Sequence, residues 1–139
     1  MNYYNNDVII AQSTPVGSSA IALIRVSGLN LKKFLPLIFK SKKIKSRYNY
    51  TVEFTGFKSK EVIDTCVVVY YQAPVSFTGE DILEISCHGN NLIIEKIINE
   101  FMEKGVRVAY PGEFSYRAFQ NNKIDLMQAE SIAEKIALN

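Results

Sequence analysis

Apolar residues along the chain follow strand spacing in some segments and helical spacing in others. Runs rich in Val, Ile and Tyr predict strands, whereas apolar positions three and four residues apart predict helices. Six strands are expected, at Val8–Ala11, Ala20–Val26, Tyr48–Phe57, Val62–Tyr71, Asp81–Cys87 and Val106–Ala109. Four helices are expected, at Leu31–Ile38, between Asn90 and Gly105, at Glu113–Phe119 and from Asp125 onward.

Capping residues and one proline set the ends of these helices. Asn90 is a favoured N-cap residue, and Gly105 stands where a left-handed C-terminal cap is needed. Asp125 is followed three residues later by Gln128, as in a capping box. Pro36 falls inside the expected helix at Leu31–Ile38, so it must either kink that helix or occupy its first turn.

The order of the elements predicts the fold class. Tyr48–Phe57 and Val62–Tyr71 are joined by a short charged turn and form a hairpin, which excludes a purely parallel sheet. We therefore expect an α+β fold, a mixed sheet with helices packed on it. Val62–Tyr71 is apolar on both sides, which favours a central position in the sheet. With 139 residues, 47% of them hydrophobic, the chain can fold as one domain around its own core.

Charge and cysteine usage narrow the class of protein. The formal net charge is only +2, and the conspicuous basic residues are bunched between Lys40 and Arg47, which argues against a nucleic-acid binder built on global charge. Cys66 and Cys87 lie inside apolar runs without disulfide or metal spacing and are interpreted as reduced core thiols. The chain has neither a secretion signal nor a membrane-spanning run, so a cytoplasmic location is expected.

Several kinds of catalytic centre have no counterpart in the sequence. The chain lacks the GxxxxGK[ST] phosphate loop and the GxGxxG turn, so it is not expected to hydrolyse GTP or ATP by itself. Cys87 and Glu84 point to opposite faces of their strand, so they cannot converge with His88 on a metal ion. Cys87 also has no base, because the side chain of neighbouring His88 diverges from it. We expect His88 to hydrogen-bond within its own turn.

Three charged residues stand in places that normally hold apolar or neutral side chains. Glu84 lies in the middle of an apolar strand, and Arg25 lies in another strand of the same kind. Lys123 is presented by the turn between the last two helices. Burying a lone charge is costly, so each must be exposed, paired or held for a ligand. If they converge, they suit a ligand with a guanidine-like hydrogen-bonding edge and an anionic or carbonyl-bearing tail.

Longer motifs resemble a known family. The segments SFTGEDILE at Ser76–Glu84, His88–Gly89, and PGEFSYRAFQNNKIDLMQAE at Pro111–Glu130 are similar to the N-terminal domain of the MnmE (TrmE) family of tRNA modification GTPases. The opening AQSTPVGSSAIALIRVSG resembles the start of the same domain. The resemblance runs from about Val8 to the last residue.

The resemblance implies a folate-binding domain related in fold to the aminomethyltransferases. Residues 1–124 would form a folate-binding and dimerisation domain, and residues 125–139 would begin a truncated helical domain. The expected cofactor is formyl-tetrahydrofolate, and the motif positions that would bind it are Arg25, Glu84 and Lys123. Glu84 would accept paired hydrogen bonds from the amino-pyrimidine edge of the pterin. Neither a catalytic residue nor a metal ligand is assigned, and a homodimer is expected.

The resemblance also implies further domains and partners, which belong to the complete family protein. It continues into a helical domain with an inserted GTPase domain, and with its partner MnmG it modifies the wobble uridine of certain tRNAs. GTP, Mg and K would bind only in that GTPase domain.

The chain departs from the family pattern at two glycine positions. Gly17 is followed by Ser18 rather than by further glycine, and Asn90 follows Gly89 where two glycines are common. The basic run from Lys40 to Arg47 lies outside the matching motifs, and it is either a solvated loop or a weak contact for tRNA phosphates.

Two other functions stay open at this stage. The first is a free-standing folate-dependent one-carbon transferase, with Asp81 or Glu80 as its catalytic acid. The second is a dimerisation-only remnant whose folate site has decayed.

Overall fold

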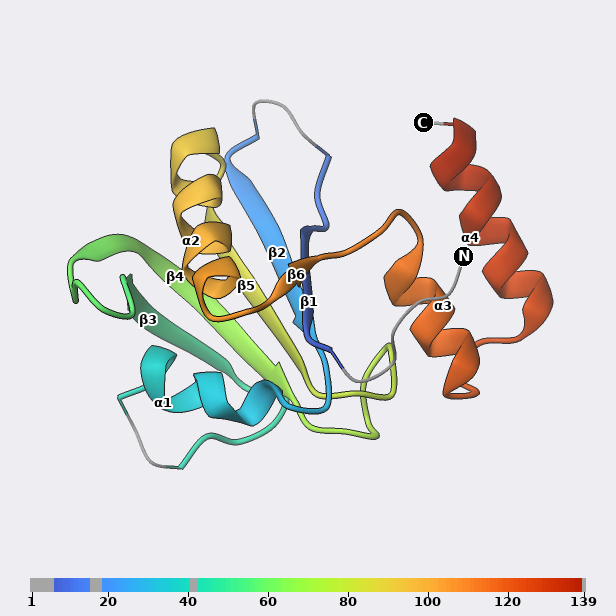
Figure 1. Ribbon diagram of the computed structural model, residues 1–139, viewed down its shortest axis with the longest axis horizontal. Helices are drawn as coiled ribbons and strands as arrows, with labels where there is room; N and C mark the ends of the chain where they lie inside the picture. The colour runs from blue at the N-terminus through green and yellow to red at the C-terminus, as the bar shows by residue number, and fades with distance from the viewer. Residues whose placement is uncertain (1–6, 16–18, 41–42, 139) are drawn as a thin grey trace.

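The computed structural model describes residues 7–15, 19–40 and 43–138 of the chain (Figure 1). Gly17, Ser18 and Lys42, to which the sequence drew attention, lie outside the described residues. The strands are β1 (Ile9–Gln12), β2 (Ile21–Ser27), β3 (Asn49–Thr55), β4 (Val62–Tyr71), β5 (Ile82–His88) and β6 (Arg107–Val108). The helices are the 3₁₀ helix η1 (Leu31–Phe34), α1 (Leu35–Ile38), α2 (Asn91–Glu103), α3 (Glu113–Gln120) and α4 (Leu126–Leu138).

The strands form one mixed sheet in the order β3-β4-β5-β2-β1-β6. Every pairing is antiparallel except that of β1 with β6, which is parallel. The α+β fold class is therefore confirmed. β4 lies in the interior of the sheet, as expected, but Val67 on it is 39% exposed, so only one of its faces is fully buried.

Local sequence signals account for most helix ends. The side chain of Asn90 accepts hydrogen bonds from the amides of Leu92 and Ile93 and thereby caps α2. Asp125 and Gln128 exchange side-chain to backbone hydrogen bonds of 2.7 and 2.9 Å, which is the expected capping box. The helix expected at Leu31–Ile38 divides instead into η1 and α1. Pro36 is tolerated there because it occupies the first turn of α1, where its missing N–H is not needed.

A hydrophobic core fills the space between α2 and one face of the sheet (Figure 1). Ile94, Ile97 and Phe101 of α2 are buried against alternate residues of the central strands. Phe34 and Phe101 have ring centroids 5.2 Å apart, and Phe57 packs edge-on against Phe101 at 5.3 Å. Aromatic packing of this kind adds to the stabilisation from burial alone. The core therefore stiffens the strands whose other face carries Arg25 and Glu84.

The cysteines lie in the core, as the sequence predicted. Cys66 and Cys87 are both buried and free. Burial, followed by the nearby Asp64, raises the pKa of Cys66 to about 12 and that of Cys87 to about 11. Both thiols are therefore protonated and unreactive near neutral pH.

Candidate functional site

Arg25 and Glu84 form an ion pair on the face of the sheet opposite α2. The two residues are cross-strand partners on β2 and β5, and Arg25 Nη2 donates to Glu84 Oε2 over 3.1 Å. Their side chains retain 25% and 20% of their exposure, so the pair is accessible to solvent. The buried Nε of Arg25 has no hydrogen-bond partner among the described residues. A buried donor of this kind is costly to leave unpaired and indicates room for a further acceptor.

Two aromatic rings flank the guanidinium group of Arg25. Its Cζ lies 5.4 Å from the ring centroid of Phe77 and 5.9 Å from that of Phe114. Phe77 belongs to the loop before β5, and Phe114 belongs to the first turn of α3. A cation held between two rings is stabilised by their electron-rich faces, and the same rings offer flat surface to a planar ligand.

A cavity of about 530 Å³ opens beside this arrangement. Arg25, Phe77 and Phe114 line it together with residues 11–13, residues 109–112 and Ile132 of α4. Glu84 and Lys123 are not among its lining residues. The volume is in the range of small-molecule sites, and one cation on a mostly apolar wall is the usual composition of such sites.

Lys123 is placed beside this site but not in contact with the ion pair. It is exposed in the turn after α3, where its amide donates to the carbonyl of Ala118 over 2.8 Å. A Cβ added at Gly79 would lie only 3.4 Å from Cε of Lys123, so the lysine side chain packs over the loop that carries Phe77. In the part of the chain that the structure describes, Lys123 forms no ion pair with Glu84. The structure therefore brings Arg25 and Glu84 together and leaves Lys123 on the adjoining loop.

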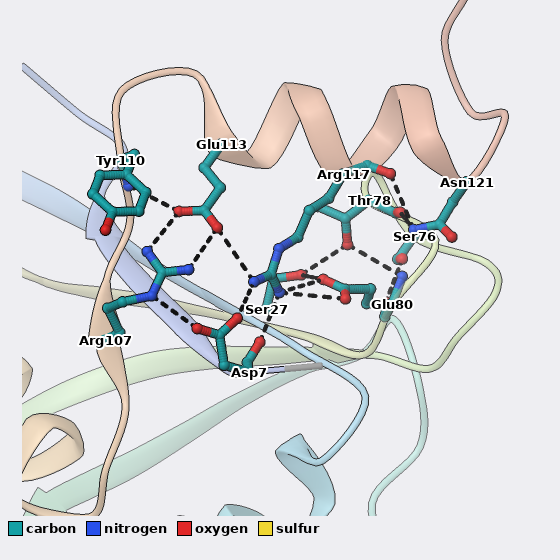
Figure 2. Close-up of polar contacts among 10 residues, drawn as sticks. All are labelled: Asp7, Ser27, Ser76, Thr78, Glu80, Arg107, Tyr110, Glu113, Arg117 and Asn121. Carbon is teal, nitrogen blue, oxygen red and sulfur yellow. Dashed lines mark hydrogen bonds and ion pairs between the residues drawn. The ribbon is translucent and has the colours of Figure 1, made fainter. Parts of the chain in front are cut away.

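A buried network of charges anchors α3 to the sheet (Figure 2). Arg117, 1% exposed, donates to the carboxylates of Asp7, Glu113 and Glu80. Arg107 of β6 pairs with the same Glu113 over 2.7 Å and with Asp7 over 2.8 Å. Patterns in the sequence did not predict this network. Its only local signal is the spacing of Glu113 and Arg117, four residues apart on one helix.

The same network fixes the loop beside the site. Glu80 accepts a hydrogen bond of 2.9 Å from Ser27, and Ser27 also contacts the hydroxyl of Thr78 at 2.8 Å. Asn121, at the end of α3, donates to the carbonyl of Thr78 over 2.8 Å. Figure 2 shows these contacts converging on the loop from both sides. Phe77, the neighbour of Thr78, is thereby held against Arg25.

Burial raises and ion pairing lowers the pKa values of the carboxylates in the network, and the balance differs from residue to residue. Burial raises the pKa of Glu80 despite its contacts with Arg117. Burial also acts to raise the pKa of Glu113, but hydrogen bonds from Arg107 and from the Tyr110 amide outweigh it and leave that pKa below its ordinary value. Asp7 behaves like Glu113, with hydrogen bonds from Arg107 and Arg117 lowering its pKa. Because their pKa values are lowered, Asp7 and Glu113 stabilise the folded state above their ordinary pKa values, whereas Glu80 does not.

The two acids considered for one-carbon transfer are occupied by protein contacts. Glu80 is 3% exposed and bonded to Arg117 and Ser27. Asp81 is 2% exposed and accepts the amide of Ala73 over 2.8 Å. Neither lines the cavity beside Arg25. Their positions fit a structural role better than that of a proton donor to a bound cofactor.

His88 makes a different contact from the one expected. Its carbonyl accepts the Asn90 amide within the turn, but its ring pairs across the strands with Asp64 of β4, at 2.8 Å from Nδ1 to Oδ1. The expectation of a contact within the turn holds only for the backbone, because the antiparallel register of β4 and β5 brings Asp64 within reach of the ring. Over the described residues, no group of three or more His, Cys, Asp or Glu side chains could hold a metal ion.

Comparison with known proteins identifies the family to which the chain belongs. The family described as GTP-binding protein TrmE N-terminus matches residues 8–123. The chain therefore belongs to the TrmE family, at the position of its N-terminal domain.

The curated relatives are longer proteins named tRNA modification GTPase MnmE. The chain is 43% identical over 136 residues to the one from a Nitratiruptor species, which covers 98% of this chain and 30% of the relative. It is 46% identical over 127 residues to that of Malacoplasma penetrans, with coverages of 91% and 28%. It is 44% identical over 130 residues to that of Aquifex aeolicus, with coverages of 93% and 29%. The chain thus spans about three tenths of the length of these relatives.

The described part of the chain contains no helix that is both long enough and apolar enough to cross a membrane.

Proposed function

We propose that this chain is the formyl-tetrahydrofolate-binding and dimerisation domain of a cytoplasmic tRNA modification GTPase. Together with MnmG, the complete protein would act on the wobble uridine of tRNA. GTP hydrolysis would belong to a separate GTPase domain, since the sequence of this chain lacks a phosphate loop. The chain would bind the one-carbon cofactor and would not itself be the catalyst.

The observation that carries the cofactor proposal is the Arg25–Glu84 pair with its aromatic surroundings. A carboxylate can accept two parallel N–H groups, and the amino-pyrimidine edge of a pterin presents such a pair. Phe77 and Phe114 offer flat apolar surface near Arg25, and the unpaired Nε of Arg25 offers a donor. These features support the proposal of a pterin site with hydrogen bonding at Glu84 and stacking near Arg25. The exposed Lys123 would attract the negatively charged tail of the cofactor.

Dimerisation is supported by apolar side chains on the same face of the sheet. Ile21 of β2 is 62% exposed and Val67 of β4 is 39% exposed, and the register places both on the face that carries Glu84. Apolar surface of this kind is a common component of subunit interfaces. A second copy packed on it would also shield the Arg25–Glu84 pair.

Residues 125–139 would begin the helical domain of the longer protein. Leu126 and Met127 of α4 are 57% and 81% exposed, and a groove of about 330 Å³ lies between α3 and α4. Exposed apolar side chains in the first turn of α4 are suited to contact with further helices.

Calorimetric titration with 5-formyl- and 10-formyl-tetrahydrofolate tests the cofactor proposal. We expect saturable binding by the parent chain and none by Glu84→Ala, with circular dichroism unchanged. Glu61→Ala, which removes an exposed carboxylate from the β3–β4 turn, is the matched control and should bind like the parent. Equal binding by Glu84→Ala and the parent would remove Glu84 from the site.

Sedimentation and product analysis separate the two alternatives. A dimer that binds neither folate would be a dimerisation module only. Turnover of either folate by the isolated chain would favour a free-standing one-carbon transferase.

A further inference from the structure

The small net charge of the chain conceals a strong segregation of charges. Residues 8–52 contain no Asp or Glu, although the chain has 14 of them. The same stretch holds eight of the 16 lysines and arginines. Acidic residues resume at Glu53. The stretch is therefore strongly cationic and the remainder of the chain is net acidic.

The fold gathers most of these cations at one end of the sheet. Ser27, the last residue of β2, and Tyr71, the last residue of β4, both pair with Ile82. β3 enters at the same end, because Asn49 pairs with Val69. The segment between β2 and β3, which includes η1 and α1, therefore lies at this end, as Figure 1 shows.

The cations of this segment face solvent. We define the basic surface as its exposed residues Lys32, Lys33, Lys40, Lys43, Lys45 and Arg47. Within the described ranges, Lys32, Lys33, Lys40, Lys45 and Arg47 form no ion pair with a carboxylate. Among the described residues, no carboxylate therefore offsets their mutual repulsion. An anionic partner would relieve it.

Backbone contacts fix the loop that carries these cations. The amide of Arg47 donates to the carbonyl of Tyr70 over 2.7 Å, and the amide of Gln72 donates to the hydroxyl of Ser46 over 3.0 Å. The amide of Lys45 donates to the hydroxyl of Tyr50 over 2.8 Å. A loop tied at three points presents its charges in a set arrangement, which reduces the entropy lost on binding.

An exposed aromatic ring accompanies the charges. Tyr48 is 56% exposed, and Nζ of Lys45 lies 5.2 Å from its ring centroid. Cations beside an exposed ring suit a nucleic acid, since the cations neutralise phosphates and the ring can stack on an unpaired base.

One residue of the basic surface, Arg47, is bonded to a strand that pairs with the strand of Glu84: its amide donates to the carbonyl of Tyr70, the neighbour of Val69, and Val69 is the cross-strand partner of Glu84. Burial, followed by Glu84, raises the pKa of Tyr71, while Arg47 and Arg25 act to lower it. Tyr71 follows Tyr70 at the end of β4, where Tyr71 pairs with Ile82. A polyanion along the loop would lie next to the end of the sheet that carries Arg25.

We propose that the basic surface binds the phosphate backbone of tRNA at the end of the sheet where the cofactor site lies. The inference rests on the proposed function for the identity of the RNA. It assigns a role to charges that folate binding does not use.

The test measures the affinity of the 139-residue chain for unmodified tRNA by fluorescence anisotropy. Salt is varied between about 50 and 200 mM, because each phosphate contact adds roughly 0.7 to 0.9 to the slope of log affinity against log salt. The triple variant Lys40→Gln, Lys45→Gln, Arg47→Gln removes three charges of the basic surface. The control Lys58→Gln, Lys96→Gln, Lys104→Gln removes three exposed charges elsewhere.

We expect the basic-surface variant to lose at least about tenfold in affinity at low salt and about two units of slope. The control should stay within about twofold of the parent. Equal losses in both variants would indicate a general charge effect and overturn the proposal. Failure of the parent chain to bind tRNA would also overturn it, as would binding to phosphatidylserine vesicles in place of tRNA.

Folate titration of the same variants separates this proposal from the proposed function. Retained folate binding with lost tRNA binding supports the basic surface as a distinct contact. The parent chain could bind tRNA but no folate, with tRNA binding lost in the basic-surface variant. That result would support the RNA contact and refute the cofactor proposal. Loss of both ligands by the variant would overturn a separate RNA surface.

Discussion

Arg25 on β2 and Glu84 on β5 occupy the same cross-strand position, with Nη2 and Oε2 3.1 Å apart. Both side chains remain partly exposed, so solvent screens their attraction. A double-mutant cycle of Arg25→Ala and Glu84→Ala, measured by urea unfolding, should give a coupling of about 0.2 to 1 kcal/mol. A coupling above about 3 kcal/mol would be typical of a buried structural pair and would contradict a role in ligand binding.

Unlike the partly exposed Arg25, Arg117 is buried, and it contacts three carboxylates. Arg117→Met leaves Glu80 and Glu113 without this partner in the protein interior. The free energy of unfolding should fall by about 3 to 5 kcal/mol, a large share of the stability of a small domain. Arg47→Met, at an exposed position, is the control and should change it by less than about 0.5 kcal/mol. A small effect at Arg117 would show that water replaces its contacts.

The acidic residues around Arg107 make stability depend on pH. Asp7 and Glu113 have folded-state pKa values below their ordinary values of 3.8 and 4.5. Their stabilising contribution is therefore present above those ordinary values and is lost as the pH falls through the lowered pKa values. Urea unfolding between about pH 5 and pH 3 should show a falling free energy of unfolding. Glu113→Gln should flatten that decline, and an unchanged slope in this variant would refute the assignment.

Glu80 makes the stability of the domain depend on pH in the opposite sense to Asp7 and Glu113. Burial raises its pKa, so its contribution is present below its ordinary value of 4.5 and is lost as the pH rises through the raised pKa. Glu80→Gln should therefore steepen the acid decline relative to the parent. The comparison of this variant with Glu113→Gln in one titration series distinguishes the two carboxylates.

Gly89 is required by a close approach between backbones. Its amide donates to the carbonyl of Ala20 over 3.0 Å, and an added Cβ would lie 1.8 Å from the carbonyl oxygen of Ser19. Gly89→Ala should destabilise the domain by about 1 to 3 kcal/mol through overpacking. It should also speed hydrogen exchange at the amide of residue 89. Gly105→Ala, where a Cβ meets nothing within 4 Å but φ is +91°, should also cost stability, through backbone strain rather than through a close contact.

Elements with a strong local signal could be predicted from the sequence almost to the residue. Asn90 begins α2 and Gly105 follows its end because the capping groups are neighbours of the amides and carbonyls they satisfy. The family pattern commonly has a second glycine at position 90, where this chain has Asn90. The side chain of Asn90 caps α2, which accounts for the difference. The division of Leu31–Ile38 into η1 and α1 was not predicted, because a proline pattern alone does not distinguish a kink from a new first turn.

The candidate site could be predicted only in part. Arg25 and Glu84 were identified because a charge in an apolar strand requires an explanation, and their convergence depends on the pairing of β2 with β5. The partner of His88 was missed for the same reason, since Asp64 lies 24 residues away on another strand.

The sequence by itself determined most strands and helices, the fold class and the family, because periodicity, caps and motifs are properties of residues close together in the chain. Only the tertiary structure decided which charges meet. Arg117 joins Asp7 across 110 positions and Glu80 across 37, because the buried guanidinium group of Arg117 and the buried carboxylate of Glu80 need partners within the protein in place of water. That requirement, rather than any local pattern, holds the loop with Phe77 against Arg25.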